Sequence, residues 1–201
     1  MQCRIKEVFL LKSNGEKKQR QKQKGSVIHD AKNLLNTKVL VFSAFLCALS
    51  VAIGFLCKTY LTFGAIRITF ENLPILMAGM YLGPFVGALV GAVADMLSCV
   101  LSGFGVNPVI TLGAAVVGAV SGIFFRHIIK RKGFLPTFVS ALIAHAFGSM
   151  LIKSIGLYLY GHPVQILLFR IPLYIGIALA ESYFIYLITK NREIASRLER
   201  L

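Results

Sequence analysis

Three ionisable residues of this 201-residue chain, Asp95, Lys153 and Arg170, fall inside long apolar stretches of sequence. Charge is costly in such a stretch unless it faces a protein interior or a ligand, so each residue is a functional candidate. One acid and two cations can hold a small polar molecule through charge-assisted hydrogen bonds, and the cationic excess suits an anion. The alternative is a structural ion pair between Asp95 and Lys153 or Arg170.

Residues near the ends of the same stretches would complete a binding site. Arg67 and Glu71 precede the second apolar stretch and could close over a cavity, while Phe70 and Tyr174 supply aromatic walls. A few polar anchors among apolar walls are typical of small-molecule pockets. The candidate ligand-binding residues are Arg67, Phe70, Glu71, Asp95, Asn107, Lys153, Arg170 and Tyr174.

Sequence patterns of catalysis and metal binding are missing. There is no HExxH, GxSxG or GxxxxGK[ST] motif, and the four cysteines form no CxxC pair, so we expect no enzyme, cofactor or metal site. At about 1.5 Å per residue, His145 falls near the middle of the membrane and Glu181 toward its inner face, whereas Asp95 falls in the outer half. That spread disfavours a small intramembrane enzyme built on these three residues.

Six apolar segments must position the candidate residues, and we expect an all-α integral membrane protein of six transmembrane helices. The segments run over residues 39–57, 72–82, 84–101, 108–129, 135–158 and 163–189, the second being short for a span of roughly 20 residues. Proline marks three of the junctions, at Pro84, Pro108 and Pro163. Residues 59–70 are largely β-branched or aromatic, which predicts an ordered outward loop, either a lid or a connector packed on the helix ends.

The basic residues give the expected orientation. Of the 22 Lys and Arg residues, 18 lie in residues 1–38, in 126–132 or from 190 onward, where they flank the apolar segments. This positive-inside pattern places both termini in the cytoplasm of a cell-membrane protein and removes the case for nucleic-acid binding. We expect a basic, disordered tail over residues 1–36, a six-helix substrate-binding domain over 37–190 and a cytoplasmic segment over 191–201.

Small residues recur at four-residue spacing in two of the expected helices, and this spacing allows another helix to approach closely. That helix belongs either to the same chain or to a partner. The candidate partner-facing residues are Ala44, Ala48, Gly87, Ala88, Gly91 and Ala92.

Three stretches, 44–48 (AFLCA), 64–74 (GAIRITFENLP) and 80–95 (MYLGPFVGALVGAVAD), carry a family resemblance. Residues 37–189 resemble the substrate-binding S components of energy-coupling factor vitamin transporters, most closely the folate-specific group. The resemblance implies a six-helix membrane fold that binds a vitamin near the outer surface. It also implies assembly with a transmembrane coupling subunit and two ATPases, with Ala44 and Ala48 on the face that contacts the coupling subunit.

Within that family the residue chemistry favours folate. Arg170, Lys153 or Arg67 can bind the two carboxylates of its glutamate tail, and Asp95 can accept from its pterin N–H groups. Three alternatives remain open: an S component for another vitamin or for a small metabolite such as a queuosine precursor, a small intramembrane enzyme, and a scaffold without a ligand.

Overall fold

The computed structural model describes residues 37–63, 66–67, 69–103, 105–129, 133–159, 161 and 164–191. Within these ranges, the side chains of residues 58, 62–63, 66–67, 127–129 and 164–169 are not described. The expected tail over residues 1–36 and the segment after Asn191 lie outside the described residues, and so does the Arg67 side chain.

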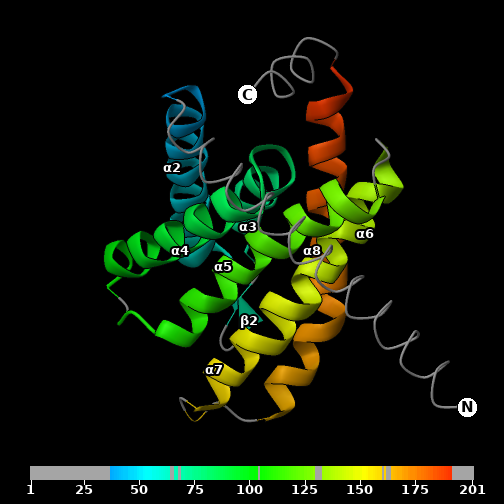
Figure 1. The fold of residues 1–201 in the computed structure, drawn as a ribbon. Coiled ribbons are helices and arrows are strands. Elements are labelled where there is room, and N and C mark those ends of the chain that lie inside the picture. Colours follow the sequence, from blue (N-terminus) through cyan, green and yellow to red (C-terminus); the bar gives the residue numbers. More distant parts are fainter. Residues whose placement is uncertain are drawn as a thin grey trace, which may run out of the picture.

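Helices occur at all six predicted positions (Figure 1). They are α2 (Thr37–Tyr60), α3 (Asn72–Met77) continued by the π-helix η1 (Ala78–Leu82), α4 (Pro84–Leu101), α5 (Pro108–Ile123) continued by η2 (Phe124–Ile129), α6 (Phe134–Ala144) continued by η3 (His145–Ile152) and α7 (Lys153–Leu159), and α8 (Val164–Lys190). The predicted boundaries are confirmed to within three residues, because the ends of the apolar runs define them.

Five of these helical segments are long and apolar enough to cross a membrane. The segment Asn72–Leu82 is apolar but shorter. Many large apolar side chains point outward along the long helices, among them Val41, Phe45, Val100 and Leu135, each at least 60% exposed. This is the surface of an integral membrane helical protein, in which lipid takes the place of water.

Local sequence explains where two helices begin. Gly83 adopts φ 118°, a backbone conformation that favours glycine, and Pro84 then opens α4 at a position that needs no backbone N–H. Asn107 caps α5 through its side-chain oxygen, which accepts hydrogen bonds from the backbone N–H groups of Val109 at 2.9 Å and Ile110 at 3.4 Å.

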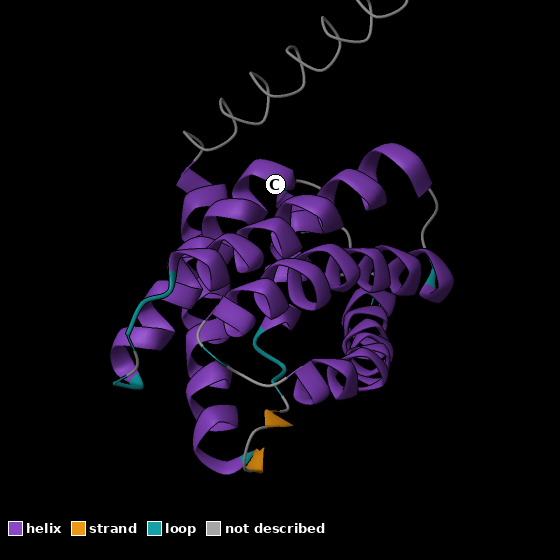
Figure 2. Cartoon of the chain, turned by 90° about the horizontal axis from the view of Figure 1, so that it is seen from below, coloured by secondary structure: helices purple, strands orange, loops and turns teal. Residues whose placement is uncertain are grey.

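The segment between α2 and α3 contains a small hairpin. Strand β1 (Thr62–Phe63) pairs antiparallel with β2 (Ile66–Arg67), with Thr62 opposite Arg67 and Phe63 opposite Ile66. Figure 2 shows the hairpin at the periphery of the helical bundle, near the end of α2. The extended backbone predicted for this segment is therefore present in these four residues.

The short helix α3 lies at the centre of the bundle, in contact with α2, α4, α5 and α8 (Figure 1). Five of its six residues are buried, which explains how so short an apolar helix is stabilised. Beside it, α4 and α5 cross closely, because a Cβ added at Gly118 would overlap the backbone of Gly87. The closest helix contact therefore depends on glycine.

Candidate functional site

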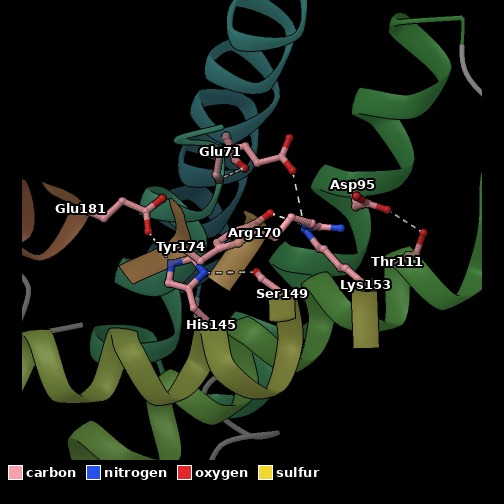
Figure 3. A network of polar contacts seen from close by, with 10 residues as sticks. Glu71, Asp95, Thr111, His145, Ser149, Lys153, Arg170, Tyr174 and Glu181 are labelled. Atoms are coloured by element: carbon pink, nitrogen blue, oxygen red, sulfur yellow. Dashed lines mark hydrogen bonds and ion pairs between the residues drawn. The ribbon is translucent and has the colours of Figure 1, made fainter. Parts of the chain in front are cut away.

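An ion pair joins the start of α3 to α7. The Lys153 ammonium lies 3.6 Å from Oε1 of Glu71, the residue that precedes α3, and both side chains are largely buried, at 6% and 13% exposed. The Glu71 backbone carbonyl also accepts a hydrogen bond from Ser50 Oγ of α2 at 2.6 Å. Two predicted site residues, far apart in the sequence, thus meet at the centre of the bundle (Figure 3).

Asp95 of α4 has a hydroxyl partner. Its Oδ2 atom accepts a hydrogen bond from Thr111 Oγ1 of α5 at 2.7 Å, and the Asp95 side chain is buried. Within the described residues, the expected alternative of an ion pair between Asp95 and Lys153 or Arg170 is not found, since Lys153 pairs with Glu71 instead.

Arg170 of α8 contacts Tyr174 one turn further along the helix. Its Nη2 donates to Tyr174 Oη at 3.0 Å, and its Cζ lies 5.2 Å from the centroid of the Tyr174 ring. The Nη1 atom is buried and has no hydrogen-bond partner among the described residues. Arg170 therefore brings a cation to the site with no carboxylate bound to it in the part of the chain that is described.

A small cavity lies beside these groups. It has about 180 Å³ of empty space, including the part open to solvent. Its lining residues are Ser50, Glu71, Ile75, Ala94, Asp95, Ser98 and Ala114. Little of this space would admit even a water molecule, so the cavity must widen before it can hold a whole vitamin.

The remaining predicted site residues lie at the edges of this region or beyond what is described. Phe70 is half-buried in the turn before α3, where its backbone carbonyl accepts from Leu73 N at 3.1 Å. Asn107 is buried as the cap of α5, and its Nδ2 has no partner in the described structure. Arg67 can be placed only through its backbone in β2.

The structure also contains a polar pair that the sequence analysis separated. His145 Nε2 lies 2.6 Å from Glu181 Oε2, and His145 Nδ1 lies 3.2 Å from Ser149 Oγ. The His145 ring packs at 5.4 Å, centroid to centroid, from the ring of Tyr174. The inference that His145 and Glu181 lie apart was therefore wrong, because two long side chains can bridge the small difference in depth between their helix positions.

These contacts change the charge balance inferred from the sequence. Glu71 and Glu181 join Asp95 in the region, so three acids stand beside two cations, and the expected cationic surplus is wrong for the region as a whole. Within the described residues, the charge of Lys153 is matched by that of Glu71, whereas Arg170 is contacted by the phenol of Tyr174 and by no carboxylate. The case for an anionic ligand now depends on Arg170.

Asn72 is a polar residue that the sequence analysis did not consider. It is fully buried, and neither its Oδ1 nor its Nδ2 has a hydrogen-bond partner among the described residues. A buried polar group left unpaired costs about 1–3 kcal/mol. The signal in the sequence was an Asn directly after Glu71 at the start of an apolar run.

The small-residue faces differ between the two helices. Ala44 and Ala48 of α2 are exposed, and Ala88 and Ala92 of α4 are half-buried. Gly87 and Gly91 are buried, and a Cβ on either would overlap the backbone of η1 or α5. The helices that approach these two glycines therefore belong to the same chain, and neither glycine is part of an exposed surface for a partner.

Metal ligands do not cluster in the described residues, where no group of three or more His, Cys, Asp or Glu side chains has the arrangement of a metal site.

Comparison with known proteins assigns the family. Residues 38–191 match the family described as "ECF transporter, substrate-specific component". An 88-residue part of the chain, 43% of its length, is 33% identical to the protein named Folate transporter FolT of Clostridium novyi (strain NT). The match spans half the length of that relative. Because the family match covers most of the chain, and all of the described helices except the first residue of α2, the chain belongs to the substrate-specific components of ECF transporters.

Proposed function

We propose that this chain is the folate-binding subunit of an ATP-driven vitamin importer. In this proposal it crosses the cell membrane six times, with both termini in the cytoplasm, and it associates with a transmembrane coupling subunit and two ATPases. Family membership and the partial match to a folate transporter support the proposal. In this proposal the chain binds the vitamin and catalyses no reaction.

The observation that favours folate as the ligand is the Nη1 atom of Arg170, which has no hydrogen-bond partner among the described residues. A guanidinium presents two parallel N–H donors that match a carboxylate, and in the described residues only one of its terminal nitrogens is engaged, by a neutral phenol. The folate glutamate tail offers two carboxylates. A carboxylate on Nη1 would satisfy a buried donor and pair a half-buried cation in the same contact.

The other candidate residues surround this anchor. Lys153 and Glu71 form an ion pair from which Lys153 can turn toward the second carboxylate, and Tyr174 presents its ring and hydroxyl beside Arg170. Asp95 borders the cavity, and Phe70 and Asn107 lie at the starts of α3 and α5. We propose all of these, with Arg67 from the hairpin, as folate-contacting residues.

Entry of the ligand requires the cavity to widen. The hairpin of β1 and β2 leads directly into the turn that carries Phe70 and Glu71, so a shift of the hairpin would move the Glu71 end of the ion pair. We propose that this segment acts as the lid of the site.

Ala44 and Ala48 supply the docking surface for the coupling subunit in this proposal. Both are exposed on α2, and small side chains at four-residue spacing allow a partner helix to approach closely. The half-buried Ala88 and Ala92 of α4 would extend this surface, whereas the buried Gly87 and Gly91 are left out of it.

The test is isothermal titration of the purified protein with folate and with pteroate, which lacks the glutamate tail, on the unmodified chain and on Arg170→Gln. Hydrogen bonds to a charged group contribute about 1.5–3 kcal/mol, so folate affinity should fall about tenfold to a hundredfold in the variant. Pteroate affinity should change much less. Riboflavin and thiamine are the control ligands, and binding of either in place of folate would overturn the proposed substrate.

A further inference from the structure

Glu181 has more hydrogen-bonding capacity than the described structure uses. Its side chain is fully buried in α8, and His145 engages Oε2 at 2.6 Å. The second oxygen, Oε1, is buried and has no hydrogen-bond partner among the described residues. A carboxylate already oriented by one imidazole and open at its other oxygen is a prepared acceptor for an N–H donor.

Asn72 supplies an unpaired hydrogen-bond donor and an unpaired acceptor in the described structure. It is fully buried at the start of α3, a helix that packs against α8, and both its amide oxygen and its amide nitrogen lack partners in the described structure. It also follows Glu71, whose carboxylate pairs with Lys153. One acceptor and one donor thus stand unpaired in the same part of the bundle.

These groups continue the site that contains Arg170. The His145 ring packs on Tyr174, and the Tyr174 hydroxyl accepts from Arg170, so the contacts run unbroken from Glu181 to Arg170 (Figure 3). The two residues are eleven positions apart on α8, which is about 16 Å along a helix. A ligand that reaches both ends is elongated, with a carboxylate at one end and hydrogen-bonding groups at the other.

We propose that Glu181 and Asn72 are specificity-determining residues that bind the edge of a planar nitrogen heterocycle carrying two adjacent N–H donors beside a carbonyl oxygen. Glu181 accepts from the donors, and the Asn72 amide pairs with the remaining edge. A 2-amino-4-oxopyrimidine ring, as in pterin, has this edge, and guanine presents the same three groups. The inference rests on the proposed function, but it moves recognition of the ring from Asp95 to Glu181, whose buried Oε1 has no partner among the described residues.

The test is titration of the purified full-length chain and of the variants Glu181→Gln and Asn72→Leu. The probes are folate, pterin and p-aminobenzoylglutamate, the last of which lacks the ring. Both variants should bind folate and pterin at least about tenfold more weakly and p-aminobenzoylglutamate unchanged. Asn72→Leu should also raise the thermal stability of the ligand-free protein, because it removes two unpaired buried groups.

Two further variants serve as comparisons. Ser182→Ala is the matched control, since Ser182 is equally buried beside Glu181 but donates to the carbonyl of Ala178 within α8. It should leave all three affinities unchanged. Asp95→Asn tests the competing assignment, and a loss of pterin binding in this variant but not in Glu181→Gln would overturn the inference.

The remaining outcomes separate the inference from the proposed function. Equal weakening of folate and p-aminobenzoylglutamate in Glu181→Gln, or no weakening of either, would overturn the inference while folate binding stands. If the unmodified chain binds pterin but not folate, the proposed substrate fails and the inference stands. Binding of none of the three probes would overturn both.

Discussion

The ion pair between Lys153 and Glu71 should be strongly coupled, and Lys153→Met tests this. Methionine keeps the stem that packs on Gly113 of α5 but removes the charge. At 3.6 Å, two unit charges attract by about 5 kcal/mol at an effective dielectric constant of roughly 20. The cost of removing both groups from water offsets much of this attraction, yet loss of one partner strands the other charge and costs about 3–5 kcal/mol.

The assay is thermal unfolding in detergent, monitored by intrinsic tyrosine fluorescence for Lys153→Met, Glu71→Gln and the double variant. For a chain of about 200 residues, each kcal/mol shifts Tm by about 2–4 °C, so Lys153→Met should lower it by about 6–20 °C. Adding Glu71→Gln to Lys153→Met should restore at least half of that loss, because both charges of this ion pair are then removed. Additive losses in the double variant would refute the reasoning.

Two other perturbations address the helix crossing and the partner surface. Gly118→Leu should prevent stable folding, since even a Cβ at this position overlaps Gly87, whereas Leu112→Ala on the exposed face of the same helix should be tolerated; equal expression of the two variants would contradict the close crossing. Ala48→Trp on exposed α2 should leave folate titration unchanged but reduce copurification with the coupling subunit at least about tenfold, and full copurification would argue against that docking face.

The helices were predictable because each begins and ends where the chemistry changes. Apolar runs of spanning length give the long helices, and Gly83-Pro84 and Asn107-Pro108 mark two of the starts. The three π-helical segments were not foreseen. A π-helix is a local change in hydrogen bonding that the surrounding packing selects, so an apolar run of sequence does not reveal it.

The site was predictable by residue type and less so by pairing. Asp95, Lys153, Arg170 and Glu71 were found because charge is rare in apolar sequence. Their partners depend on helix rotation, which hydropathy does not reveal, so the Asp95 bond to Thr111 and the His145 contact with Glu181 came only with the structure. In the same way, four-residue spacing put Gly87 and Gly91 on one face without telling which neighbour that face meets.

Folate uptake tests the central claim most directly. The chain would be coexpressed with the coupling subunit and the two ATPases of its own genome. Accumulation of radiolabelled folate would be followed in right-side-out membrane vesicles that contain ATP in their lumen. The account predicts ATP-dependent accumulation that excess unlabelled folate abolishes, that riboflavin leaves unchanged and that Arg170→Gln reduces at limiting folate. An assembled complex that hydrolyses ATP but accumulates no folate would contradict it.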